Sequence, residues 1–288
     1  MPDWKLMRKK RPIMNKTKKR FTEAYLGVYG LWLLAFVVAP LLLLLIQSLN
    51  VPGQGFSFEN YRDFFTSGPY LAMTVNSIWY AFLITVLTLA IAYPLALCLT
   101  KLKHRQLWLL LVILPTWINL LLKTYAFIGL LGKDGLLNQS IEAMGFGSQQ
   151  LLFTNGAFLL VAAYIELPFM VLPIYNALLD IDPLLPAASR DLGASSFQTL
   201  KKVIWPLSMP GVKTGVQTVF IPSLSLFMIT RLIGGNKVIT LGTAIEEHFL
   251  VTQNWSFGST IGVVLIVAMG LTMALTTDRK KRKKGGRK

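Results

Sequence analysis

Residues Asp180 to Gly211 read DIDPLLPAASRDLGASSFQTLKKVIWPLSMPG and separate two long apolar blocks of the chain. Connections between neighbouring elements are usually a few residues long, so a polar segment of about thirty residues is unusual. Pro183 and Pro186 suit the first turn of a helix, where a missing N–H is tolerated. Helix-compatible residues then run toward Gly193, which permits a bend. The segment therefore predicts structure of its own rather than a plain connection.

A second helical pattern begins at Ser195, which is a good N-cap residue. We expect Trp205-Pro206 and Pro210-Gly211 to end this helix. The prediction is a short amphipathic helix or helix pair along the inner membrane surface. It is either a linker that only covers the bundle or a docking element for a cytoplasmic partner. The apolar residues that recur near helical spacing are Leu192, Phe197, Leu200 and Ile204.

The composition of the chain indicates a polytopic membrane protein. Of its 288 residues, 53% are hydrophobic and 15% are charged, whereas a soluble domain carries about 25% charged residues. The net charge of +16 is concentrated near the two ends, in residues 5–20 and 279–288. Both clusters flank apolar blocks, as the cytoplasmic ends of membrane spans do, and suit the anionic headgroups of a lipid bilayer. This distribution argues against nucleic acid as a partner.

Six apolar blocks are long enough to cross a bilayer, which takes about twenty mainly apolar residues. Each is a helix candidate, because a lone strand leaves its backbone groups unpaired in lipid. The predicted fold is therefore all-α with six transmembrane helices. The predicted spans are 24–46, 71–99, 107–131, 157–179, 212–233 and 258–277.

The orientation of these spans follows from the distribution of lysine and arginine. Most basic residues lie in the two ends of the chain, in 101–106 and in 180–211, which places these segments and both termini in the cytoplasm. The predicted organisation is a basic cytoplasmic tail at 1–23, a six-span domain at 24–277 with the long loop at about 180–211, and a basic cytoplasmic tail at 278–288.

The long loop resembles the cytoplasmic coupling loop of permease subunits of ABC importers, which has the form E-A-A-x-x-x-G, nine residues, I-x-L-P. Gly193, Val203 and Pro206 stand at the matching positions, but Ala187 replaces the glutamate and Trp205 the leucine. The resemblance implies that the loop sits in a groove of an ATPase subunit. The loop residues it points to are Ala187, Ala188, Ser189, Arg190, Asp191, Leu192, Gly193, Ala194, Ser195 and Phe197.

The rest of the chain is similar to spermidine/putrescine permeases of the PotB type. The stretch from Pro115 to Tyr125 resembles their Pro-x-Trp-x-Asn/Ser-x-x-x-Arg-x-Tyr pattern, with Lys123 in place of the arginine. The stretches 167–175 and 234–258 also fit, although Ser256 stands where the family usually has proline. The resemblance implies a type I ABC importer permease with both termini in the cytoplasm of a bacterial inner membrane.

The partners implied by this resemblance are a second, PotC-like permease subunit, a PotA-like ATPase dimer and a PotD-like extracytoplasmic polyamine-binding protein. ATP-Mg would bind the ATPase, and this chain would bind no cofactor. Iron, sulfate and opine permeases share the loop, so these substrates stay open as alternatives. Two other classes also stay open: a proton-coupled secondary transporter that uses Glu166, and a non-transporting membrane scaffold.

Glu166 lies in the middle of the predicted fourth span, where an isolated charge costs about 3 kcal/mol on insertion scales. Its carboxylate either meets a cationic substrate or forms a structural pair, for example with Lys123, for which a structural or gating role is favoured. Pro168 and Pro173 predict a locally broken helix nearby. Aromatic residues would suit ammonium groups through cation–π contacts. The candidate pathway residues are Glu166, Trp117, Asn119, Lys123, Tyr125 and Tyr164.

No catalytic constellation is visible in the sequence, so no enzymatic activity is expected. There is no GxxxxGK[ST] phosphate loop, and the one cysteine, Cys98, excludes an intrachain disulfide. His104 and His248 fall on opposite sides of the membrane in the predicted topology. They cannot share a metal ion, and each is expected to be a surface histidine.

Overall fold

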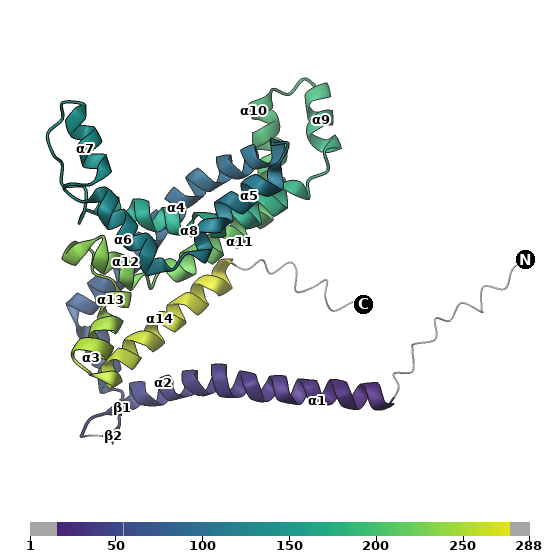
Figure 1. Cartoon of the computed structure of the whole chain (residues 1–288). Coiled ribbons are helices and arrows are strands. Elements are labelled where there is room, and N and C mark those ends of the chain that lie inside the picture. Colours follow the sequence, from purple (N-terminus) through teal and green to yellow (C-terminus); the bar gives the residue numbers. More distant parts are fainter. Residues whose placement is uncertain (1–15, 54, 277–288) are drawn as a thin grey trace, which may run out of the picture.

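A computed structural model describes residues 16–53 and 55–276, and nearly all of their regular structure is helical (Figure 1). Two short strands, β1 (Asn50–Val51) and β2 (Gly55–Phe56), form an antiparallel pair. The predicted tail at 278–288 and most of the tail at 1–23 lie outside the described residues. The structure therefore tests the predictions for the helical part of the chain and not those for the tails.

Three long helices form the centre of the molecule: α4 (Gly68–Lys101), α8 (Asn155–Leu179) and α11 (Trp205–Ser223). α8 packs against both α4 and α11, and the main apolar core lies between these helices. Two glycines of α11 allow its close approach to α8. A Cβ at Gly211 would lie 2.5 Å from the Pro173 carbonyl oxygen, and one at Gly215 would lie 2.7 Å from the Met170 sulfur. Small residues four apart are a common device for bringing helices together in membranes.

The first span is an extended arm made of α1 (Lys16–Leu33), the π-helical turn η2 (Leu34–Val38) and α2 (Ala39–Leu49). Figure 1 shows α1 leaving the body of the molecule, while α2 approaches the last helix, α14 (Trp255–Thr276). α2 packs against α14. Nearly all the large apolar side chains of the arm that the structure describes are exposed. Away from α14, the arm therefore presents a long exposed apolar surface.

The remaining elements lie at the ends of these helices or between them. α9 and α10 lie at one end of the molecule, whereas α3, α7 and α13 lie toward the other (Figure 1). These elements are α3 (Glu59–Thr66), α5 (Arg105–Ile113), η3 (Leu114–Trp117), α6 (Leu120–Leu131), α7 (Leu136–Ala143), α9 (Leu184–Asp191), α10 (Ser196–Thr199), η4 (Leu200–Ile204), α12 (Phe227–Leu232), η5 (Gly235–Lys237), α13 (Leu241–Glu246) and η6 (Glu247–Val251).

Within the described part of the chain, four helices are long and apolar enough to cross a membrane: Tyr25–Leu49, Gly68–Lys101, Asn155–Leu179 and Trp255–Ala274. A bent pair, Arg105–Trp117 with Leu120–Ala143, would be a fifth span, although its halves meet at 95°. The prediction of an all-α membrane protein is confirmed. The count of six spans stays a prediction.

Two predicted spans are not the continuous helices that their apolar composition suggested. The block at 107–131 breaks after Trp117, where Asn119 starts α6 as an N-cap by accepting a hydrogen bond from the Leu121 N–H at 2.8 Å. The block at 212–233 breaks between α11 and α12, just after Pro222. Hydropathy measures length and apolarity, but it does not register such caps and proline turns.

The predicted break in the fourth span is wrong. α8 runs without interruption through Pro168 and Pro173. Each proline removes one backbone donor and crowds the carbonyl four residues earlier. Packing of α4 and α11 against α8 holds the helix together across both positions.

Candidate functional site

The segment predicted as a coupling loop forms two helices joined by a tight bend. α9 carries Ala187, Ala188, Ser189, Arg190 and Asp191, and Leu192 is its C-cap. Gly193 has a φ of +84°, a conformation in which glycine avoids the strain of a side chain. Ala194 and Ser195 complete the turn, and Phe197 lies on α10. The bend that Gly193 predicted is therefore present.

Side-chain hydrogen bonds fix the start of the second helix. Ser195 Oγ accepts from the Gln198 N–H at 3.3 Å, and Gln198 Oε1 accepts from the Ser195 N–H at 2.9 Å. This reciprocal pair is a capping box. The hydroxyls of Ser189 on α9 and the buried Thr199 on α10 lie 3.2 Å apart. The two helices are thus joined to each other as well as capped.

The second helix does not end at Trp205-Pro206 or Pro210-Gly211, so that prediction is wrong. α10, η4 and α11 follow one another without a gap from Ser196 to Ser223. Proline removes one donor, and its ring conflicts with the usual helical spacing. The π-helical turn η4 ends at Ile204, two residues before Pro206, and its wider spacing lets the helix continue. The loop is consequently the extended end of a core helix.

The outer faces of α9 and α10 expose apolar and basic side chains together. Leu192 is 89% exposed, and Phe197 is also largely exposed. A hollow of about 340 Å³ lies between the end of α4 and the loop, lined by Lys101, Arg190 and Phe197 among others. Exposed apolar groups rimmed by polar ones are typical of a protein interaction surface.

A buried contact that the sequence did not predict connects this helix to α4. The hydroxyls of Tyr93 on α4 and Ser208 on α11 lie 3.0 Å apart, and Ser208 also donates to the Trp205 carbonyl at 3.1 Å. Tyr93 is 7% exposed and Ser208 is fully buried. The Tyr93 and Trp205 rings meet edge-on, with centroids 4.6 Å apart. Tyr93 and Ser208 are 115 residues apart, so no local pattern signals the pair.

Among the candidate pathway residues, Glu166 and Lys123 are brought into one region. Glu166 on α8 is 5% exposed. Lys123 on α6 is the charged group that acts on it electrostatically. In the described part of the chain the two side chains do not reach ion-pair distance. The carboxylate is therefore buried near a positive charge, without the close pairing that would neutralise it.

The other four candidates lie around the break between η3 and α6 or on α8. Trp117 ends η3 and is exposed, and Asn119 is the N-cap of α6. Tyr125 on α6 is exposed. Tyr164 on α8 stacks edge-on against Phe127 of α6, with ring centroids 5.1 Å apart. None of these four side chains contacts Glu166 through a hydrogen bond in the described structure.

The opposite end of the molecule is held by buried polar contacts between distant segments. Asn60 Nδ2 on α3 donates to Ser256 Oγ at 2.6 Å and to the Ser48 carbonyl at 3.3 Å. Ser256 donates to the Asn50 carbonyl at 2.6 Å, and Thr260 donates to the Ser48 carbonyl at 3.1 Å. These bonds join α2, α3 and α14 into one unit, which we call the outer polar cluster.

His248 is not the surface histidine that the sequence suggested. Its Nε2 lies 2.9 Å from the Tyr70 hydroxyl, and its ring packs against Phe257. Burial lowers the pKa of His248 below its usual value of 6.5, and the neighbouring Glu247 carboxylate acts in the opposite direction. The residue lies in η6, and Tyr70 of α4 and Phe257 of α14 contact its ring, so three elements meet there.

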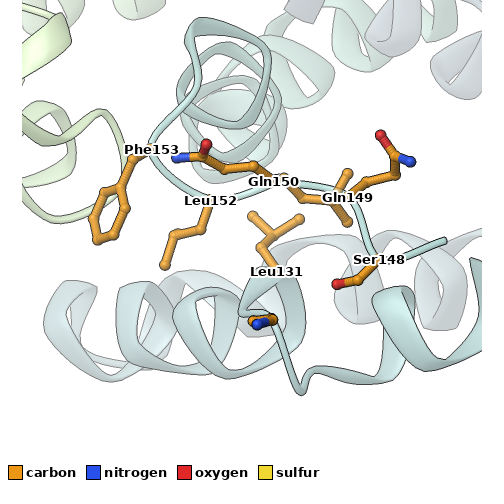
Figure 2. A pocket seen from close by; sticks show the side chains of 8 residues that line it. Leu131, Ser148, Gln149, Gln150, Leu152 and Phe153 are labelled. Atoms are coloured by element: carbon orange, nitrogen blue, oxygen red, sulfur yellow. The ribbon is translucent and has the colours of Figure 1, made fainter.

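A hollow with a volume of about 570 Å³ lies away from these groups. Figure 2 shows Leu131, at the end of α6, beneath the segment from Ser148 to Phe153. Lys133 is its charged lining residue. None of the candidate pathway residues lines it, so its size does not identify it as part of the pathway.

Comparisons with known proteins cover nearly the whole chain. The chain is 37% identical over 269 residues to the spermidine/putrescine transport system permease protein PotB of Haemophilus influenzae, covering 90% of this chain and 93% of that protein. It is 34% identical over 252 residues to PotB of Escherichia coli K12, covering 84% and 91%. No protein-family model matches it. The likeness in sequence thus extends far beyond the loop at Asp180 to Gly211.

The fold is also similar to that of a solved transporter. A chain of a bacterial ABC transporter involved in the import of alginate matches with a TM-score of 0.76, covering 91% of this chain and 97% of that chain. The two sequences are 18% identical, so the similarity concerns the fold alone.

Proposed function

The chain belongs to the PotB family of ABC importer permeases, and we propose that it forms one half of a polyamine pathway driven by a separate ATPase. In this proposal a PotD-like binding protein delivers spermidine or putrescine from outside. A second, PotC-like permease completes the pathway, and a PotA-like ATPase dimer binds and hydrolyses ATP-Mg. This chain itself binds no cofactor and catalyses no reaction. It is a multi-pass protein of the bacterial inner membrane, and we place both termini in the cytoplasm.

The observation that carries the proposal is the exposed helix pair α9–α10. Leu192 stands at its bend with 89% of its surface exposed, and Phe197 is exposed beside it. Exposed apolar groups on a capped, internally bonded helix pair suit a protein groove. The continuous helix from α10 to α11 would carry a movement of that groove into the core. ATP-driven closure would then shift the balance between inward-open and outward-open arrangements.

Docking can be tested by replacing both apolar side chains with serine. Leu192→Ser with Phe197→Ser should reduce co-purification of the ATPase dimer with the membrane complex. The matched control is Leu250→Ser, since Leu250 is 72% exposed but lies in η6 at the other end of the molecule. Unchanged ATPase association in the double variant would refute the docking role of α9–α10.

For the substrate, the proposal rests on Glu166. A buried carboxylate near one unpaired positive charge is poorly compensated, so an incoming ammonium group improves its surroundings. Lys123 would keep that site from holding the cation too tightly, which a transport pathway requires. The aromatic faces of Trp117, Tyr125 and Tyr164 would assist through cation–π contacts when the pathway is assembled.

Uptake of labelled spermidine by the complete importer tests this role. Glu166→Gln removes the charge and should lower uptake about tenfold, the effect of about 1.4 kcal/mol, while the complex still assembles. Glu142→Gln, which removes an exposed carboxylate on α7, is the control and should leave uptake unchanged. Uptake of iron or sulfate instead of spermidine by the unaltered complex would overturn the substrate and leave the permease role intact.

The exposed arm α1–η2–α2 supports the presence of a second permease subunit. Among the described residues, the arm packs mainly against α14 and most of its large apolar side chains are exposed, so lipid and a partner helix bundle are left to cover the rest. A Trp32→Cys variant, made after Cys98→Ser, should form a cross-link to the second permease with a short bifunctional reagent. Cross-linking only to a second copy of this chain would contradict the proposed heteromeric pathway.

The orientation can be tested independently of transport. Reporter tags at either end of the chain should be accessible from the cytoplasmic side and protected from outside. Their accessibility from the external side would reverse the placement of α9–α10 and remove the proposed ATPase contact.

A further inference from the structure

The hydroxyl pair of Tyr93 and Ser208 lies where the loop helix enters the core. Ser196 to Ser223 form one uninterrupted helical path, and Ser208 stands on it just beyond the π-helical turn η4. Any displacement of α10 therefore moves the backbone that carries Ser208. The residue on the other side of the contact belongs to α4, a helix with no covalent link to the loop nearby. The pair thus joins the helix that receives the movement to a second core helix.

The neighbourhood of Tyr93 gives α4 a place to bend. Pro94 follows it directly and lies inside α4, where it leaves the Ala90 carbonyl without its usual helical donor. Prolines are common sites of bending in helices. The part of α4 beyond Pro94 ends at Lys101, which lines the hollow beside the loop. The inner end of α4 can therefore follow the loop while the rest of the helix stays packed.

Trp205 adds an aromatic contact beside the same hydroxyl pair. Its ring meets the Tyr93 ring edge-on at 4.6 Å between centroids, and its carbonyl accepts from Ser208. An edge-to-face pair has a preferred geometry that a flexible aliphatic side chain lacks. Hydrogen bonds that are fully buried are also directional and expensive to break. Together the three residues hold α4 and α11 in one relative position.

We propose that Tyr93 is a positioning residue that transmits movement of the coupling loop to α4 through Ser208 and Trp205. The inference rests on the proposed docking of α9–α10 to an ATPase and says how that docking reaches the spans. It requires no contact of Tyr93 with substrate. Loss of the hydroxyl should therefore separate ATP hydrolysis from uptake without abolishing either assembly or hydrolysis.

The test uses the complete importer in proteoliposomes, with spermidine uptake and ATP hydrolysis measured on the same sample. Tyr93→Phe keeps the ring and removes the hydroxyl. It should lower the uptake per ATP hydrolysed about fivefold, the change in an equilibrium that one net hydrogen bond produces. Ser208→Ala should do the same, and the double variant should be no worse than either single variant, because both remove one contact.

The control is Ser223→Ala. Ser223 is also a buried serine of α11, but its hydroxyl donates only to the Val219 carbonyl of its own helix among the described residues. Its removal should leave uptake per ATP unchanged. If Tyr93→Phe assembles poorly, Ser208→Ala decides the same question from the other side of the contact.

Two outcomes would overturn the inference. An unchanged ratio of uptake to hydrolysis in Tyr93→Phe and Ser208→Ala would show that the contact does not transmit movement. A ratio that falls equally in Ser223→Ala would show a general effect of losing a buried hydroxyl. Failure of the proposed function is recognised separately, since the unaltered complex would then lack an associated ATPase or spermidine uptake.

Discussion

Different kinds of contact stabilise the two ends of this molecule. In the outer polar cluster, Asn60 and Ser256 join three segments through directional hydrogen bonds. At the other end, α11 lies against α8 through the bare backbone of Gly211 and Gly215, and Tyr93–Ser208 supplies a hydroxyl contact to α4. The first arrangement resists any change of relative position. Where α11 lies on α8 through these two glycines, the contact is van der Waals packing, which resists separation but tolerates sliding better than a directional bond does.

This difference fits the proposed function, in which an ATPase moves the end that carries α9 and α10. The loop helices α9 and α10 project from the end where α11 packs closely on α8, and they expose apolar side chains there. The end that contains the outer polar cluster can serve as a fixed base. Its hydrogen bonds connect segments about 200 residues apart in the sequence, such as those of Asn60 and Ser256. The two ends should therefore differ in stability and in their effect on coupling.

The largest effect is expected from Gly211→Val. The first added carbon would lie 2.5 Å from both the Pro173 carbonyl oxygen and the Ala177 Cβ, so α11 must move away from α8. Such overpacking costs about 1–3 kcal/mol, and more where backbone is in the way. The apparent melting temperature of the purified complex should fall sharply. Gly270→Val on α14 is the control, since nothing lies within 4 Å of a Cβ there. Equal losses in both variants would contradict the close-packing account.

Asn60→Leu should have the next largest effect, and it should act on stability alone. The substitution removes one buried donor from the Ser48 carbonyl and one from the Ser256 hydroxyl oxygen, which costs about 1–3 kcal/mol. The apparent melting temperature should fall, while uptake per ATP in the surviving complex should not change. Asn76→Leu, at an exposed asparagine of α4, is the control. A drop in coupling with Asn60→Leu would show that the cluster is not a fixed base.

The sequence predicts some parts of this structure well, and physical reasons explain the rest. The blocks 71–99 and 157–179 match α4 and α8 within a few residues, because length and apolarity are strong signals. The bend at Gly193 and the cap at Ser195 also follow from residue type. The breaks at Asn119 and after Pro222 depend on caps and packing, which a hydropathy window averages away.

The candidate site divides in the same manner. The loop residues follow from the family resemblance around Gly193 and stay a prediction as a docking site, whereas the pattern Gly211-x-x-x-Gly215 is a sequence signal for the α8 contact that the structure contains. The Tyr93–Ser208 contact could not have been found, because it joins residues 115 apart with no shared motif. The continuity of α8 through Pro168 was missed because it depends on the neighbouring helices.

His248 offers a pH-dependent test of the outer end. Burial lowers its pKa below 6.5, so the unfolded chain binds a proton there at a higher pH than the folded chain does. Stability should therefore fall as the pH drops through 6.5 toward the lower pKa of the folded state. His248→Gln should flatten this fall in apparent melting temperature between about pH 7.5 and pH 5.5. The groups around the ring are Tyr70 of α4, Glu247 and Thr252 beside it, and Phe257 of α14.

The control for the pH series is His104→Gln, at an exposed histidine that makes no capping bond to α5. In this variant the apparent melting temperature should fall with pH as steeply as in the unaltered protein. If the apparent melting temperature of His248→Gln still falls with pH as in the unaltered protein, another group causes the acid sensitivity and His248 does not contribute to it.

The smallest effect is expected at the other end, from Ala187→Glu. Ala187 is exposed on α9, in the position where the permease family has a glutamate. An added carboxylate can pair with a basic group of the ATPase, but exposed ion pairs are worth at most about 1 kcal/mol. Association with the ATPase should tighten about twofold at low salt, and the gain should vanish at high ionic strength.

Ala187→Gln is the uncharged control. Equal tightening by both variants, or none by Ala187→Glu, would indicate that docking depends on the shape of Leu192 and Phe197 and on the existing charges of Arg190 and Asp191. Ala187 is exposed, so α9 can accept a larger side chain there without losing a buried contact, whereas the buried, hydrogen-bonded Asn60 of the outer polar cluster allows no such replacement.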